Sequence, residues 1–236
     1  MDKKYQEKRK IIEQYFISKK KLLESEFVEV SPSGNFQLEV HRYSTGPNTW
    51  DFSRGIVTRT SDNSITADVK RNYGHFWHTW VEHPNGNEYL LCGEDYQGYS
   101  IVNLTNGKYL TYFPQAGHKG GGFCWTKVYP SPDNFVLAVD GCYWASPYDL
   151  VMFDFRNPDE LPYKEMTRIS NIDKCEGWTD NYTFVLKQEI EFRKSDGALY
   201  DELSEEDQDV LDKDLSLLGY RYDIVHFKRP PFDKDA

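Results

Sequence analysis

The sequence predicts an all-β fold, mainly antiparallel, made of about four repeated four-stranded units, with an N-terminal helix and a helical insertion near the C-terminus. Three observations support this prediction. Apolar and polar residues alternate in segments such as Phe36 to Val40, which is the pattern of a half-buried strand. Short runs of Pro, Asn, Asp and Gly, which favour turns, separate these segments. The runs also recur at a nearly constant interval.

The interval between turns is the main quantitative signal. Pro32, Pro84 and Pro132 lie in three such turns and are 52 and 48 residues apart. The aromatic runs that begin at Gly74 and Gly122 are also 48 residues apart. Periods of this size in a chain of strands indicate four-stranded units. Each unit is expected to contain a tight turn, a long loop and a second tight turn between its strands.

Residues 1–25 form the first predicted segment, an amphipathic helix. Tyr5, Ile12 and Phe16 recur near a 3.6-residue period, and no Pro or Gly interrupts residues 3–24. The segment carries eight basic residues against four acidic ones. We expect its apolar stripe to pack against the rest of the protein. The alternative is that its lysines contact an anionic partner or a membrane surface.

Residues 26–236 are predicted to form a single β-repeat domain with an acidic helical insertion at residues 195–219. Nine acidic residues and one lysine fall within residues 196–214. Ser204 is the expected N-cap, Asp207 occupies the third helical position, and Gly219 is the expected stop. Residues 221–228 then return as a strand.

The strand-rich part of the chain resembles β-propeller repeats over residues 26–192, with a return at 220–228. It lacks the Gly-His and Trp-Asp marks of WD repeats, so the resemblance concerns architecture. The run from Gly141 to Tyr148, GCYWASPY, resembles a motif of uncharacterised bacterial and fungal proteins, which implies no known activity. Four units are the lower limit for closing a propeller. We therefore expect a small or incomplete propeller, with an open array or a sandwich of meanders as the alternative.

Composition argues against several classes of partner. The net charge of −10 disfavours nucleic-acid binding, which needs clustered positive charge. No apolar run approaches the ~18 residues of a membrane helix. The N-terminus also lacks the apolar stretch of a signal peptide. We therefore expect a cytoplasmic protein that needs no cofactor and binds neither nucleic acid nor membranes.

Cysteine and histidine positions do not predict a metal site. The cysteines adjoin apolar or aromatic runs, which predicts buried or half-buried thiols, and their spacing does not match a paired-ligand zinc site. They are Cys92, Cys124, Cys142 and Cys175. His75, His78 and His83 are close in sequence, but His75 and His78 would point to opposite faces of a strand. Packing between sheets is expected for Trp77, Trp80 and Trp125.

In an up-and-down meander the long connections share one end of the strands, here called the loop end. These connections are predicted at residues 42–49, 71–75, 93–99, 115–122, 141–149 and 173–178. Binding groups concentrate on loops, and Tyr and Trp offer large contact areas. We therefore expect a peptide, a protein segment or a polar small molecule to bind there. The predicted ligand-binding residues are Tyr73, His75, Glu94, Asp95, Tyr96, His118, Lys119, Tyr143, Trp144, Tyr148, Asp149, Glu176 and Trp178.

Two rival hypotheses remain open. In the first, the loop end holds the active site of a hydrolase-type enzyme, with Cys142 as nucleophile, His118 or His75 as base and Asp140 or Asp149 as orienting group. Glu94 is a further catalytic candidate in that hypothesis. In the second, the basic N-terminal helix of one copy pairs with the acidic insertion of another and forms a homo-oligomer.

Overall fold

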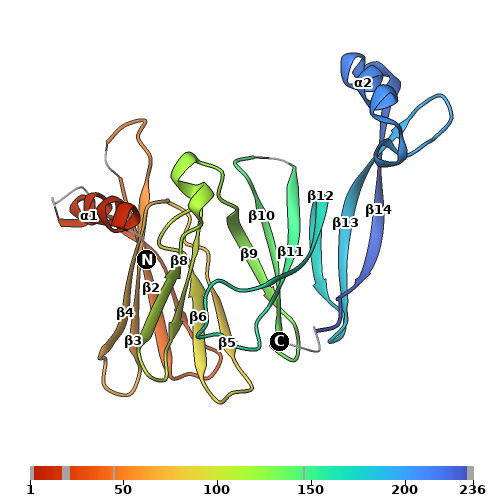
Figure 1. Cartoon of the computed structure of the whole chain (residues 1–236). Helices are drawn as coiled ribbons and strands as arrows, with labels where there is room; N and C mark the ends of the chain where they lie inside the picture. Colours follow the sequence, from red (N-terminus) through yellow and green to blue (C-terminus); the bar gives the residue numbers. More distant parts are fainter. Residues whose placement is uncertain (1–2, 18–21, 45, 146, 233–236) are drawn as a thin grey trace.

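The protein is built from three antiparallel sheets that stand side by side in chain order (Figure 1). The computed structural model describes residues 3–17, 22–44, 46–145 and 147–232, without the side chains of residues 22–26. Ser146 of the GCYWASPY run lies outside the described residues. Neighbouring strands within each sheet are consecutive in sequence. The predicted all-β, antiparallel fold class is therefore confirmed.

Sheets A and B are the four-stranded meanders that the repeat predicts. Sheet A contains β1 (Leu22–Val30), β2 (Phe36–Tyr43), β3 (Phe52–Arg59) and β4 (Ile65–Arg71). Sheet B contains β5 (Thr79–Glu82), β6 (Glu88–Cys92), β7 (Tyr99–Asn103) and β8 (Lys108–Tyr112). A short 3-10 helix, η1 (Gln115–Lys119), lies in the connection from sheet B to sheet C.

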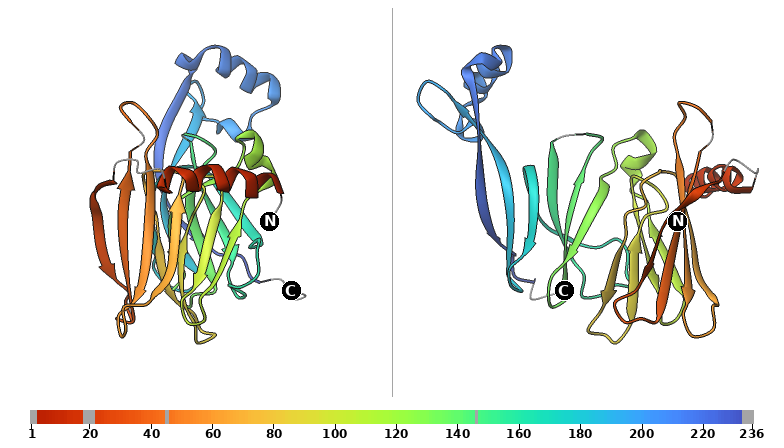
Figure 2. Two further views of the ribbon diagram at one scale, coloured as in Figure 1. Left: turned by 90° about the vertical axis from the view of Figure 1, so that its left-hand side faces the viewer. Right: turned by 180° about the vertical axis from the view of Figure 1, so that it is seen from behind.

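Sheet C has six strands because the third and fourth repeat units are joined in it. Its strands are β9 (Cys124–Pro130), β10 (Val136–Cys142), β11 (Tyr148–Asp154), β12 (Glu165–Trp178), β13 (Thr183–Arg193) and β14 (Leu218–Lys228). The sheets form an open row (Figure 2). The described sheets are therefore not closed into a ring, an arrangement that fits both an incomplete propeller and an open array of meanders.

Strand β12 reverses direction at the loop end. Its register places Glu165 opposite Phe153 and Ile172 opposite Tyr148, so its first arm rises toward the loop end. A straight continuation would carry Trp178 about 20 Å further, yet the Trp178 indole donates to the Tyr129 carbonyl at the opposite end, 2.8 Å away. The bend falls near Asn171, whose φ is +60°.

This reversal corrects one sequence-based prediction. Residues 173–178 were expected to form a long loop, but they form the second arm of β12. That arm pairs with β13, from Ile172 opposite Gln188 to Trp178 opposite Phe184. The fourth unit thus consists of this arm, β13 and β14, and the described chain supplies it with no fourth strand.

Three apolar clusters hold the sheets together. One lies between sheets A and B and includes Leu38 and Leu90. A second lies between sheets B and C, where the ring centroids of Trp77 and Trp125 are 5.7 Å apart. The third lies between the two halves of sheet C and includes Phe184. The prediction that the tryptophans pack between sheets is confirmed, including Trp80, which packs against the A–B cluster.

The predicted N-terminal helix is present but shorter than expected. Helix α1 (Lys3–Ile17) buries Tyr5 and Ile12, and residues 22–24, which were predicted to be helical, already belong to β1. The end of the predicted helix at residues 18–21 lies outside the described residues. The tertiary pairing of β1 with β2 overrides the local helical pattern at residues 22–24.

The helical insertion is also confirmed, with one boundary corrected. It contains η2 (Tyr200–Glu202), α2 (Glu205–Lys213) and η3 (Leu215–Leu217). Ser204 is the N-cap, and its hydroxyl accepts a hydrogen bond from the Asp207 N–H at 3.2 Å. Gly219, the predicted stop, instead lies inside β14, because the helix already ends at Lys213.

Candidate binding site

Several cavities open near the loop end, and two of them are lined by residues of both sheet B and sheet C; another, of about 490 Å³, lies beside Tyr148 and the bend of β12. The larger of the two shared cavities, here called the side pocket, has a volume of about 330 Å³ and lies between β7, β8, β9, β11 and the first arm of β12. The smaller, the central pocket, has a volume of about 140 Å³ and lies between the loops of all three sheets. The GCYWASPY loop reaches both, because Tyr143 lines the side pocket whereas its neighbour Trp144 lines the central pocket.

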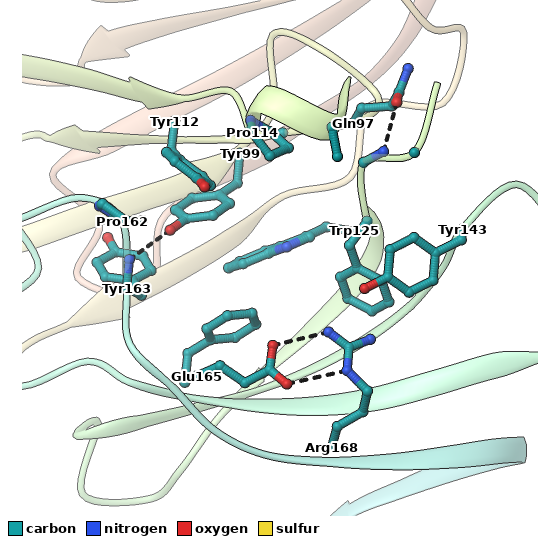
Figure 3. A pocket seen from close by; sticks show the side chains of 16 residues that line it. Gln97, Tyr99, Tyr112, Pro114, Trp125, Tyr143, Pro162, Tyr163, Glu165 and Arg168 are labelled. Atoms are coloured by element: carbon teal, nitrogen blue, oxygen red, sulfur yellow. Dashed lines mark hydrogen bonds and ion pairs between the residues drawn. The ribbon is translucent and has the colours of Figure 1, made fainter. Parts of the chain in front are cut away.

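Stacked aromatic rings form the wall of the side pocket (Figure 3). Tyr99 lies between Tyr163 and Trp125, with ring centroids 5.2 and 4.2 Å away and interplanar angles of 15° and 22°. Trp125 also stacks on Phe153 at 5.1 Å. The Tyr99 hydroxyl accepts a hydrogen bond from the Tyr163 N–H at 2.7 Å. The segment between β11 and β12 is thereby fastened to sheet B beneath the pocket.

An ion-paired arginine forms the polar side of the pocket. The Arg168 guanidinium donates two hydrogen bonds to Glu165, at 3.2 and 2.9 Å, and one to Asp149 at 2.8 Å. It lies 4.9 Å from the Phe123 ring centroid and 5.3 Å from that of Tyr143. Burial acts to lower the pKa of Arg168, but the bonds to Glu165 and Asp149 outweigh it and raise that pKa. The guanidinium is therefore a fixed positive charge beside aromatic faces.

The glycine run contributes to the rim of the side pocket. The Gly122 N–H donates to the Gln97 side-chain oxygen at 2.9 Å. A Cβ at Gly122 would lie 2.8 Å from the Gln97 carbonyl oxygen, so only glycine allows this approach. Gly122 therefore fixes the Gln97 side chain at the mouth of the pocket.

The central pocket is ringed by aromatic side chains from four loops. Trp50 lies 5.1 Å from Tyr73 and 6.0 Å from Tyr96, and Tyr96 lies 5.6 Å from Trp144 (ring centroids). Arg71 also lines this pocket and is 2% exposed. Burial lowers its pKa to about 10.

Backbone carbonyls hold Arg71 in place. Its guanidinium donates to the carbonyls of His75, Gly93 and Asp95 at 2.8, 2.7 and 3.0 Å. These bonds join the connection before β5 to the loop between β6 and β7. Arg71 therefore fastens two loops together.

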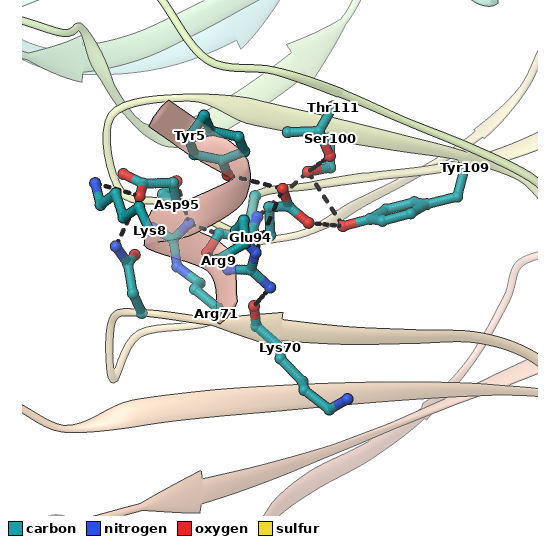
Figure 4. A network of polar contacts seen from close by, with 12 residues as sticks. Tyr5, Lys8, Arg9, Lys70, Arg71, Glu94, Asp95, Ser100, Tyr109 and Thr111 are labelled. Carbon is teal, nitrogen blue, oxygen red and sulfur yellow. Dashed lines mark hydrogen bonds and ion pairs between the residues drawn. The ribbon is translucent and has the colours of Figure 1, made fainter. Parts of the chain in front are cut away.

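Helix α1 contacts the two acidic residues of the β6–β7 loop (Figure 4). Glu94 accepts hydrogen bonds from the hydroxyls of Tyr5 and Tyr109 at 2.7 and 2.8 Å. Arg9 donates to the Glu94 carbonyl at 3.0 Å, and Lys8 lies 2.7 Å from the Asp95 carboxylate. Burial and the Glu94 charge raise the pKa of Tyr5. Glu94 and Asp95, which were predicted to bind a ligand, are thus buried in contacts within the chain.

The structure brings five of the predicted ligand-binding residues together. The central pocket collects Tyr73, His75, Tyr96, Trp144 and Tyr148. Two further predicted residues belong to the side pocket, since Tyr143 lines it and Asp149 holds Arg168.

The remaining predicted residues lie elsewhere. His118 and Lys119 line a separate hollow near α1. Glu176 and Trp178 were placed on a loop, but both lie on the second arm of β12. Glu176 pairs with Lys174 at 2.9 Å, and Trp178 reaches the end of the strands opposite the loop end. Neither residue contributes to the two pockets at the loop end.

Sequence reasoning missed much of the side pocket. Tyr163 and Arg168 lie on or next to the first arm of β12, and Trp125 was expected to serve packing alone. No local signal marks these residues, because they meet only when β12 crosses beside β11. The recurrence of aromatic residues at equivalent strand positions was the single available indication for Trp125.

The residues proposed for catalysis do not gather at one site. Cys142 and His75 line the central pocket, whereas His118 makes an edge-to-face contact with Phe113, with ring centroids 5.0 Å apart. Asp149 is bonded to Arg168 and Glu94 to the N-terminal helix. Asp140, which stands opposite Leu150, has a pKa raised by burial to about 6. The hydrolase hypothesis thus retains only the Cys142 and His75 combination.

The thiols are in their predicted surroundings. Cys92, Cys142 and Cys175 are buried and Cys124 is half-buried, and all four are free. Burial raises the pKa of Cys92 and Cys175 to about 12 and that of Cys124 to about 11. These three thiols are therefore protonated and weakly nucleophilic at neutral pH.

The three histidines near residue 80 point to different surroundings. His83 lies 3.1 Å from the Phe155 carbonyl, and His78 lies 3.2 Å from the Glu29 carboxylate, whereas His75 lines the central pocket. Within the described part of the chain, no group of three His, Cys, Asp or Glu side chains is arranged to hold a metal ion.

Comparison with known proteins gives partial matches. No protein-family model matches the chain. Over 138 residues the chain is 35% identical to an uncharacterised protein of Acanthamoeba polyphaga mimivirus, which covers 57% of this chain and 54% of the relative. The chain thus spans about half the length of the curated relative that it matches. Across the described residues, no helix is both long and apolar enough to cross a membrane.

Two solved structures are similar in part. Hydrazine synthase of Kuenenia stuttgartiensis matches with a TM-score of 0.42 and 13% identity, over 70% of this chain and 44% of that one. A eukaryotic initiation factor matches with a TM-score of 0.34 and 12% identity, over 89% of this chain and 58% of that one. Both TM-scores are too low to establish a shared fold.

Proposed function

We propose that the protein is a non-catalytic binding module and that the side pocket is its ligand site. The observation that supports this proposal is a cavity of about 330 Å³ with stacked aromatic rings on one side and the Arg168–Glu165 pair on the other. Ligand sites in proteins are typically concave, largely apolar and supplied with a few fixed polar groups. The side pocket has all three properties. We further propose that the module works in the cytoplasm.

The side pocket suits a ligand better than the central pocket for two reasons. Its volume lies in the range of ~300–1,000 Å³ that small-molecule sites occupy, whereas the central pocket is smaller at about 140 Å³. Its charged groups are also compensated within the pocket, because Glu165 and Asp149 surround Arg168. A neutral polar ligand can therefore enter without leaving a buried charge unpaired.

The walls of the pocket define the chemistry of the ligand. The faces of Tyr99 and Trp125 are buried against each other, so the ligand meets ring edges and the half-exposed Tyr143. The Gln97 amide, the Glu165 carboxylate and the Arg168 guanidinium offer hydrogen bonds. We propose a polar small molecule with one apolar face; the same groups would also suit a single side chain of a peptide.

A thermal-shift screen with sugars, nucleotides, short peptides and metal ions tests this proposal. A ligand that binds only the folded state raises the melting temperature, by an amount equivalent to about 2.7 kcal/mol at one hundred times its Kd. Tyr143→Ala and Trp144→Ala then form a matched pair, because these neighbours line different pockets.

The two variants separate the possible outcomes. Loss of the shift in Tyr143→Ala, with the shift retained in Trp144→Ala, supports the side pocket. The reverse pattern moves the ligand to the central pocket. If no compound shifts the melting temperature, the proposal of a small-molecule ligand is wrong.

A further inference from the structure

Strand β14 leaves one edge of sheet C open. It pairs with β13 along its whole length, from Leu218 opposite Arg193 to Lys228 opposite Thr183. No other described strand pairs with it. Each of the first three units has a fourth strand beside its third, namely β4, β8 and the first arm of β12. In the fourth unit the corresponding position, next to β14, is filled by no described strand.

The open edge carries exposed apolar residues. Tyr220, Tyr222 and Ile224 are 49%, 51% and 59% exposed and alternate along one face of β14. Arg221 and Asp223 alternate on the other face and form an exposed ion pair at 3.2 Å. The β13–β14 ribbon extends past the loop end toward α2, clear of the sheets (Figure 2). Exposed edges of this kind bind further strands unless a protein covers or interrupts them.

We propose that a second copy of this chain pairs with β14 in antiparallel fashion, about a two-fold axis centred on Tyr222. The added strand occupies the position of the fourth strand in the fourth unit. In this register Arg221 lies opposite Asp223 of the second copy, and Asp223 lies opposite Arg221. Tyr220 lies opposite Ile224 of the second copy. Both opposite-charge pairs and aromatic–β-branched pairs stabilise antiparallel strands, and two-fold symmetry makes each pair occur twice.

The charge pattern selects this register over its neighbours. Residues opposite each other share one face of the sheet, so the two-fold axis must pass midway between the two copies of one residue. An axis said to pass through a residue has this meaning below. An axis through Arg221 or Asp223 places like charges directly opposite each other, which is destabilising. An axis through Ile224 places Arg221 opposite Phe227 and Asp223 opposite Val225, so neither charge has a partner.

The β14 edge differs from the dimer surface that the charge distribution of the sequence predicts, in which the basic helix α1 pairs with the acidic insertion. The basic residues Lys8 and Arg9 of α1 are bonded to Asp95 and Glu94 within the same chain. These two side chains could reach the acidic insertion of another copy only by breaking their contacts with Asp95 and Glu94, whereas Lys3, Lys4 and Lys10 of α1 are exposed. The β14 edge requires no such rearrangement.

Sedimentation velocity over a concentration series tests the proposal with charge-reversal variants. The native chain is expected to form dimers as its concentration rises. Arg221→Asp and Asp223→Arg should each raise the dimer dissociation constant about tenfold, because both symmetric pairs become like-charged. An equal mixture of the two variants should dimerise as the native chain does, and so should the double variant R221D/D223R, since opposite charges again face each other.

Lys174→Glu is the matched control. Lys174 pairs with Glu176 two residues away on β12, as Arg221 does with Asp223, and is exposed. Reversing the charge at residue 174 should leave the dimer dissociation constant unchanged. The proposal is overturned if the native chain is monomeric at every concentration, or if the single reversals leave the dimer intact. A mixture that dimerises no better than either variant alone would also overturn it, whereas recovery in the mixture shows that both variants fold.

Discussion

At the loop end, α1 covers part of the junction between sheets A and B, whereas the junction between sheets B and C opens there into the side pocket. Above the first junction, α1 buries Tyr5 and bonds to Glu94 and Asp95 through a tyrosine hydroxyl, an arginine and a lysine. At the second junction, stacked aromatic rings leave a cavity of about 330 Å³. Two junctions between similar four-stranded meanders thus differ at the loop end: a helix covers one, and a cavity opens at the other.

The difference separates residues that hold the fold from residues that are available to a ligand. Buried charges such as Glu94 and Arg71 are surrounded by partners within the chain, so their substitution should be costly. Tyr143 is half-exposed at the open junction, so its substitution should change binding more than stability. The following predictions test this contrast, in order of decreasing effect on the free energy of unfolding.

Arg71→Met should produce the largest loss of stability. It removes three hydrogen bonds from the guanidinium to buried backbone carbonyls, and unsatisfied buried acceptors are costly. We expect a loss of about 3–5 kcal/mol in the free energy of unfolding, measured by urea denaturation. Arg54→Met is the control, because its ion pair with Asp68 is partly exposed and should contribute at most about 1 kcal/mol. Equal losses would contradict the contrast.

Glu94→Gln should loosen α1 without unfolding the sheets. The substitution removes the buried charge that faces Arg9 and weakens the bonds from Tyr5 and Tyr109. We expect a loss of about 2 kcal/mol and faster hydrogen exchange within residues 3–17. The control is Glu39→Gln on β2, whose partner His41 lies 3.1 Å away at a more exposed site. Unchanged exchange of α1 in Glu94→Gln would show that the network does not hold the helix.

Asp140→Asn should stabilise sheet C at neutral pH. Burial raises the pKa of Asp140 to about 6, and its Oδ1 accepts no hydrogen bond within the described residues. Because the folded-state pKa lies above the unfolded one, the cost of ionisation is absent below pH ~4 and grows as the pH rises through about 6. With partial solvent screening, we expect a gain of about 1 kcal/mol at pH ~7.

The pH dependence provides the check on Asp140. The stability difference between Asp140→Asn and the native chain should shrink toward zero as the pH falls from about 6 to about 4. A difference that is constant across this range would mean that Asp140 does not titrate in the folded protein as its burial implies.

Tyr143→Ala should have the smallest effect on stability. The ring is 48% exposed and contacts Phe123 and Arg168, so we expect a loss of about 0.5 kcal/mol in the free energy of unfolding. Trp144→Ala, at 59% exposure, should be comparable. A loss of several kcal/mol in Tyr143→Ala would show that the open junction depends on this residue for its fold.

The repeat spacing predicted the architecture because each unit encloses its own turns. Turns such as 31–35 and 83–87 depend on a few consecutive residues, so the sequence marks them directly. The reversal of β12 was missed because it needs only one residue with positive φ, Asn171. A single asparagine does not distinguish a bend from an ordinary strand residue.

The residues that line the two candidate pockets were predicted only in part, for a related reason. The loops identified Tyr73, Tyr96 and Trp144 because aromatic residues in long connections are visible in the sequence. The burial of Glu94 was not visible, since it depends on α1, which is far away in the chain. Arg168 was missed because its neighbours Tyr143 and Phe123 come from other strands and loops. Contacts between segments that are distant in the sequence thus decide which of the predicted ligand-binding residues are accessible to a ligand.

The most direct test of the contrast between the two junctions is hydrogen exchange, followed by mass spectrometry, with and without a ligand found in the thermal-shift screen. We expect slower exchange in residues 112–124, 141–145 and 162–170, which surround the side pocket, and no change in residues 70–76 and 92–96, which lie beside α1 and the central pocket. Protection confined to residues 70–76 and 92–96 would contradict this expectation.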